Sequence, residues 1–129
     1  FWVSEGLATM FELNEYRALG PAAANPRRQE TLRAARHADA LLPLEQFITL
    51  TRVDTSSQQT IRRLYGQAWG LFRFLLQREP DGMREYLRRF RAAPPGPRTE
   101  AAMRRDFVEA FGPMAEVKEA WQRWLDRLP

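Results

Sequence analysis

The chain has 129 residues, of which 44% are hydrophobic and 28% charged, and these values are typical of one globular domain with a buried core. It contains no cysteine and a single histidine, His37, which excludes disulfides, cysteine nucleophiles and any zinc site built from two imidazoles of this chain. The formal net charge is +4, and arginine supplies every basic residue except Lys118.

Apolar residues recur at helical spacing from the start of the chain, which predicts helices throughout its N-terminal half. The first helix is expected over about residues 4–16 and should end before the break at Gly20 and Pro21. A weaker helix is expected over about residues 29–42. The short segment 44–50 should then place three apolar side chains in the core, Leu44, Phe47 and Ile48.

The clearest helix is expected over residues 60–78, because its apolar side chains cover more than one face. A helix that is apolar almost all round is normally buried, so this helix should be the central one. Ser56 or Ser57 is expected to cap its N-terminus, and Pro80 with Gly82 should close the segment. Three of its side chains are predicted to be buried, Trp69, Phe72 and Leu75.

Further helices are expected towards the C-terminus. One begins near Met83 and ends at the proline-rich turn 94–97, and Thr99 should cap the next one. The inward side chains of that next helix are expected to be Met103, Phe107, Val108 and Phe111, and the last helix carries Val117, Trp121, Trp124, Leu125 and Leu128. No alternating strand pattern and no internal repeat occur. The prediction is therefore a single all-α domain over residues 1–129, a compact bundle of five to seven helices.

The first residues, Phe1-Trp2-Val3-Ser4-Glu5-Gly6-Leu7-Ala8, resemble the W-x-x-E-G-x-A segment of gluzincin metallopeptidases, most closely the bacterial peptidase-MA-like families. In those families the glutamate of this segment is the third zinc ligand, and it lies on the helix after the one that bears H-E-x-x-H. The resemblance therefore implies that Glu5 binds zinc, whose fourth position stays open for water. The alternative is a surface glutamate in a first helical turn, where the helix dipole favours a negative charge.

A second segment, Leu64-Tyr65-Gly66-Gln67-Ala68-Trp69, resembles the Y-x-x-G/A helix that follows the glutamate helix in these enzymes. In the aminopeptidase branch that tyrosine donates a hydrogen bond to the developing oxyanion, so the resemblance implies this role for Tyr65. The alternative is a core tyrosine whose hydroxyl reaches a partner or solvent. The residues after Tyr65 differ from the charged pair and glycine of the aminopeptidases, which argues against an amine-binding specificity.

Three other segments follow the same family order: residues 41–47, 81–87 and 121–125. The resemblance thus covers nearly the whole chain and implies the C-terminal half of a gluzincin-like catalytic domain. Under this hypothesis the Tyr65 hydroxyl and the Glu5 carboxylate should face one cleft, roughly within ten ångströms of each other, because the zinc-bound water attacks a carbonyl whose oxygen the phenol meets.

The sequence contains no H-E-x-x-H, and His37 has no second histidine one turn later, so it cannot rebuild the motif. We therefore expect a C-terminal piece of a longer protein whose upstream segment supplies both histidines; a degenerate relative without zinc is the alternative. Zn²⁺ would then be a cofactor of the parent protein, and none is expected in this chain alone. The missing helix should leave exposed apolar surface beside Trp2 and Leu7, and such a patch favours self-association.

The leading functional hypothesis is thus a zinc-dependent metallopeptidase that hydrolyses a peptide or protein substrate, with this chain alone inactive. The alternative is a non-catalytic helical interaction or scaffold module. Because acidic residues interleave with the arginines and no recognised nucleic-acid motif occurs, we expect no nucleic-acid partner. No apolar run approaches the roughly 18 residues of a membrane span, and His37 is expected on the surface. Many relatives of such families lie outside the bacterial cytoplasm, which suggests the same compartment here.

Overall fold

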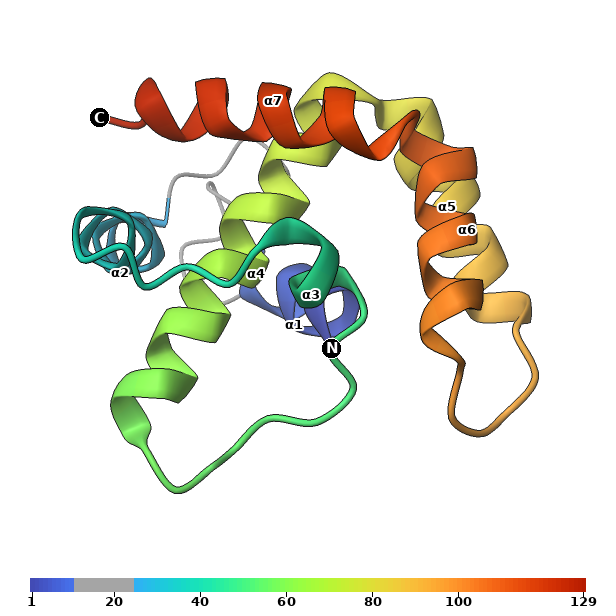
Figure 1. The fold of residues 1–129 in the computed structure, drawn as a ribbon, viewed down its shortest axis with the longest axis horizontal. Helices are drawn as coiled ribbons and strands as arrows, with labels where there is room; N and C mark the ends of the chain where they lie inside the picture. The colour runs from blue at the N-terminus through green and yellow to red at the C-terminus, as the bar shows by residue number, and fades with distance from the viewer. Residues whose placement is uncertain (11–24) are drawn as a thin grey trace.

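A computed structural model describes residues 1–10 and 25–129, and every regular element in these residues is an α-helix (Figure 1). The elements in chain order are α1 (Trp2–Thr9), α2 (Pro26–His37), α3 (Leu44–Ile48), α4 (Gln58–Arg78), α5 (Pro80–Ala92), α6 (Glu100–Phe111) and α7 (Met114–Asp126). The described part of the chain contains no strand, so the all-α prediction with five to seven helices is confirmed. Within the same residues, no helix is both long and apolar enough to cross a membrane.

Helix α4 runs through the middle of the molecule, as its all-round apolar sequence predicts (Figure 1). Helices α1, α2, α5 and α7 all pack against it. The predicted cap is Ser57, whose hydroxyl oxygen accepts a hydrogen bond from the backbone N–H of Thr60 at 3.3 Å. The side chains of Trp69, Phe72 and Leu75 are buried, as expected. Burial of this one helix therefore organises the core.

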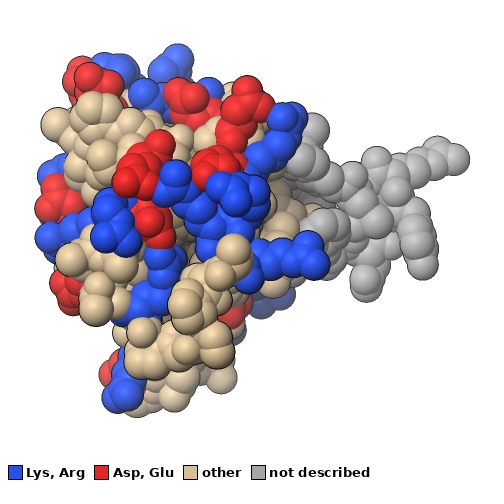
Figure 2. All heavy atoms as spheres, turned by 90° about the vertical axis from the view of Figure 1, so that its right-hand side faces the viewer, with Lys and Arg blue, Asp and Glu red and all other residues tan. Residues whose placement is uncertain are grey.

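Helices α5 and α6 pack side by side at one edge of the molecule (Figure 1). The Thr99 hydroxyl caps α6 as predicted, accepting from the backbone N–H of Ala102 at 3.2 Å. Acidic and basic side chains lie next to each other on this face (Figure 2). Hydrogen bonds from Arg88 and Arg89 lower the pKa of Glu85 to about 2. Arg88 and Arg89 are thus engaged with a carboxylate of their own helix.

Several helix limits differ from the sequence-based expectation. The first helix begins at Trp2 instead of residue 4, and its expected continuation over residues 11–16 lies outside the described residues. Helix α2 begins at Pro26 and ends at His37, so residues 38–42 are not helical. The central helix ends at Arg78 before Pro80, as expected. The next helix, however, begins at Pro80 instead of near Met83, so Gly82 lies inside it; the first turn of a helix tolerates proline because its N–H has no intrahelical partner there.

Two expectations about exposure are wrong. Trp2 is only 2% exposed, because its ring packs against Tyr86, with ring centroids 5.3 Å apart, and against Phe107 at 6.0 Å. Leu7 is 42% exposed, so the expected apolar surface is found at Leu7 and not at Trp2. Val108 was expected to point inward but is 37% exposed, since the neighbouring Phe107 and Phe111 fill the inner face of α6.

Replacing Asp39 by glycine is expected to stabilise the protein by up to about 1 kcal/mol. Asp39 follows α2 with a φ of 49°, a left-handed conformation, while the Ala40 N–H donates to the Ala35 carbonyl at 2.9 Å. The left-handed conformation costs a typical side chain about 1–2 kcal/mol, and glycine removes this cost. The gain exceeds the loss in stability that comes from the larger conformational entropy of glycine in the unfolded chain. Urea unfolding measures the change, and Asp39→Ala, which keeps the strain, should give no gain. A lower stability of Asp39→Gly than of the parent contradicts the prediction.

Candidate functional site

Glu5 lies in the first turn of α1, and its side chain is half-buried. Within the described residues its carboxylate has no salt bridge and accepts no side-chain hydrogen bond. Glu5 is therefore a carboxylate that remains available to bind a cation, as the zinc-ligand hypothesis requires.

Tyr65 lies in the first half of α4 and is also half-buried. The edge of its ring meets the ring of Phe1, with centroids 5.8 Å apart and planes at 84°. The Arg28 guanidinium lies over the same ring, 5.2 Å from its centroid. These contacts hold the tyrosine ring between Phe1 and α2. They are compatible with both roles considered for the hydroxyl, a catalytic hydrogen-bond donor and a core group.

A close helix crossing joins the elements that carry Glu5 and Tyr65. At Gly6 a Cβ atom would lie 2.7 Å from the Phe72 Cβ and 2.9 Å from the Ala68 carbonyl oxygen, so only glycine allows α1 to lie this close to α4. Phe1 and Glu5 are four residues apart and therefore share one side of α1. Since Phe1 contacts Tyr65, that side of α1 faces the tyrosine. The distance between the Glu5 carboxylate and the Tyr65 hydroxyl stays a prediction.

The described residues contain no group of three or more His, Asp or Glu side chains that could hold a metal ion. His37, as predicted, is exposed at the end of α2, on a helix other than the one that bears Glu5. Glu5 can therefore supply one ligand, and a complete set needs groups from outside the described residues.

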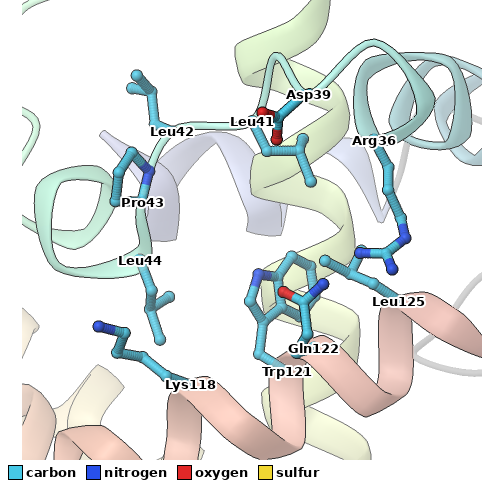
Figure 3. A pocket seen from close by; sticks show the side chains of 10 residues that line it. All are labelled: Arg36, Asp39, Leu41, Leu42, Pro43, Leu44, Lys118, Trp121, Gln122 and Leu125. Atoms are coloured by element: carbon cyan, nitrogen blue, oxygen red, sulfur yellow. The ribbon is translucent and has the colours of Figure 1, made fainter.

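A cavity of about 230 Å³ lies between the segment after α2 and helix α7 (Figure 3). Trp121 and Gln122 of α7 face the loop residues Leu41–Leu44, and Arg36 and Lys118 mark its two ends. Neither Glu5 nor Tyr65 lines this cavity. It is therefore a separate feature of the fold.

The buried side chain of Gln67 fixes the loop that borders this cavity. Its Nε2 donates to the Leu42 carbonyl at 2.7 Å, and its Oε1 accepts from the Leu42 N–H at 3.0 Å. In the sequence, Gln67 stands out only as a departure from the aminopeptidase pattern. Its role could have been predicted from its place on the buried face of α4, because a buried amide needs hydrogen-bond partners in the core.

Comparison with known protein families adds one finding. The family model described as "Protein of unknown function (DUF1570)" matches residues 1–96. The chain belongs to this family. The DUF1570 match spans α1 to α5 and so includes Glu5, Gly6 and Tyr65. No curated protein and no solved structure matches the chain. The family description gives no activity, so the resemblance to gluzincin peptidases stays a prediction.

Proposed function

We propose that this chain is the C-terminal helical part of a zinc-dependent metallopeptidase of the gluzincin type, which hydrolyses a peptide or protein substrate. The observation that carries the proposal is the crossing of α1 and α4, where the side of α1 that bears Phe1 and Glu5 meets Tyr65. The half-buried carboxylate of Glu5 adds support, because it has no ion pair within the described part of the chain and so can bind a metal.

Each residue has a defined part in this proposal. Glu5 supplies one anionic metal ligand, and an upstream H-E-x-x-H segment of the parent protein supplies the two histidines and the general base. When bound, Zn²⁺ lowers the pKa of a water molecule and polarises the scissile carbonyl. The Tyr65 hydroxyl donates a hydrogen bond to the oxygen that becomes negative in the transition state. Gly6 lets α1 lie close to α4, which supports the part of the proposal in which both side chains border one cleft.

Metal analysis of the full-length protein tests the role of Glu5. Glu5→Ala is expected to lose most of its bound zinc, because one of three protein ligands is removed, while helical content measured by circular dichroism is unchanged. The matched control is Glu116→Ala, since Glu116 is an exposed glutamate in the first turn of α7. Unchanged zinc in Glu5→Ala would remove Glu5 from the site.

The role of Tyr65 is tested in the same protein by Tyr65→Phe. This variant should keep its zinc but lose about 10²- to 10³-fold in kcat for peptide hydrolysis, the usual effect of losing one oxyanion donor. A full-length protein that binds no zinc and cleaves no peptide would favour the other hypothesis, a helical interaction module. In that case the exposed side chain of Leu7 is a candidate contact for a partner or a second copy.

A further inference from the structure

A second candidate site lies between the C-terminal half of α4 and helix α7, which crosses it (Figure 1). The cavity there has a volume of about 320 Å³. Three arginines line it, Arg78, Arg123 and Arg127, together with the aromatic rings of Phe74 and Trp124. None of its lining residues is acidic, and neither Glu5 nor Tyr65 belongs to it.

The charge of this cavity is not fully balanced. Arg123 pairs with Glu119, and the Nε of Arg78 lies 3.9 Å from a carboxylate oxygen of Glu79. Within the described residues, Arg127 has no carboxylate within 4.0 Å, and its Nε donates to the Arg123 carbonyl at 3.1 Å. One positive charge therefore remains at the cavity without an acidic partner, and both acids that are present lie outside its wall.

Arg78 provides an independent observation. Its Nη1 is buried and has no hydrogen-bond partner among residues 1–10 and 25–129. A buried donor without an acceptor is unfavourable, and the guanidinium group is suited to bind both oxygens of a carboxylate or a phosphate. An anionic oxygen in this cavity would balance the remaining positive charge of its arginines.

The aromatic side chains of the cavity, Phe74 and Trp124, indicate which chemical group carries the anion. Trp124 stacks on Trp121, with centroids 5.3 Å apart and planes at 14°, and its Nε1 donates to the Gln77 side-chain oxygen at 3.2 Å. Phe74 packs beside it at a centroid distance of 6.0 Å. Because Trp124 is held in place and only partly buried, it offers a fixed apolar surface next to the guanidinium groups, and the buried ring of Phe74 supports it from behind.

We propose that this cavity binds a small organic anion, in which a carboxylate or phosphate is carried by an aromatic or apolar group. The arginines bind the oxyanion, and the partly exposed ring of Trp124, which packs on Phe74, binds the apolar part. The site is separate from the Glu5 and Tyr65 crossing, so it stands whether or not the parent protein is a peptidase.

Fluorine NMR of the protein labelled with 5-fluorotryptophan tests this proposal. The Trp124 signal is assigned as the one lost in Trp124→Phe. Titration with benzoate and with phenyl phosphate should shift this signal saturably, with a Kd of about 1 mM, as expected for ligands of this size. The neutral benzamide and the small anion acetate should bind far more weakly, since each lacks one half of the recognised chemistry. The tighter of the two aromatic anions identifies the oxyanion, carboxylate or phosphate.

Variants show whether the arginines are responsible. Arg123→Gln, at a side chain that is more than half exposed, and Arg78→Met should each weaken binding by about tenfold. Arg104→Gln is the control, because Arg104 is an exposed arginine on α6 that does not line this cavity. Absence of a saturable shift, equal binding of benzamide, or unchanged affinity in Arg123→Gln would overturn the proposal. Should Arg78→Met fail to fold, Arg123→Gln decides the question.

Discussion

Replacing Phe72 by alanine is expected to lower the free energy of unfolding by about 3–5 kcal/mol, the usual range for a buried aromatic side chain. Phe72 is 3% exposed and lies at the crossing of α1 and α4, where its Cβ meets Gly6. Glycine has no side chain that could move into the space left by the ring, so the cavity should persist and the loss should be near the upper end. Denaturant unfolding followed by circular dichroism measures it as a lower midpoint.

Phe90→Ala is the matched control, since it makes the same chemical change on α5 at a side chain that is 41% exposed. Its expected cost is under about 1 kcal/mol, because little apolar area leaves the core. A cost below about 1 kcal/mol for Phe72→Ala as well would mean that the crossing of α1 and α4 does not contribute to the core. It would also remove the packing argument for the proposed function.

The central helix could be predicted from the sequence because its signal is local. Apolar residues on nearly every side of a 21-residue segment exclude a solvent-facing position, and a serine stands before the segment to cap it. Burial of Trp69, Phe72 and Leu75 followed from that pattern alone. The caps at Ser57 and Thr99 were predictable for the same reason, because a capping hydroxyl acts within three residues.

Helix limits were less predictable where the same residue type can either end one helix or begin the next. Pro80 suits both the end of a helix and the first turn of the next, and here it begins α5 directly after α4 has ended at Arg78. Helix α2 stops at His37 although the sequence pattern continues, because Asp39 adopts a positive φ and Gln67 holds Leu42 in the following loop. The hydrogen bonds between Gln67 and Leu42 join residues 25 positions apart, so they depend on tertiary structure.

The candidate sites show the same limit. Glu5 and Tyr65 could be chosen from sequence because each lies in a recognisable segment, but the link through Phe1 depends on how α1 crosses α4. The cavity of Arg78, Arg123 and Arg127 could not be predicted, since arginines occur along the whole chain. Only the packing of α7 on α4 determines which of them meet beside Trp124.

Gly6→Ala is expected to lower the free energy of unfolding by about 1–3 kcal/mol, the usual cost of overpacking. The new methyl group would meet the Phe72 Cβ at 2.7 Å and the Ala68 carbonyl oxygen at 2.9 Å. Neither atom is the end of a flexible side chain, so α1 must move away from α4. Alanine favours a helix over glycine by about 1 kcal/mol, which offsets part of this cost.

Gly66→Ala is the matched control, because it brings the same gain in helix propensity inside α4 without the clash against backbone that Gly6→Ala causes. Its nearest contact would be the Thr31 Cγ2 at 3.1 Å, the end of a side chain, so its loss in stability should be clearly smaller than that of Gly6→Ala. Denaturant unfolding of both variants gives the comparison. Under the proposed function, Gly6→Ala should also lower the zinc occupancy of the full-length parent, because the shift of α1 carries Glu5 with it. Equal stability of the two variants would show that α1 does not depend on this close approach.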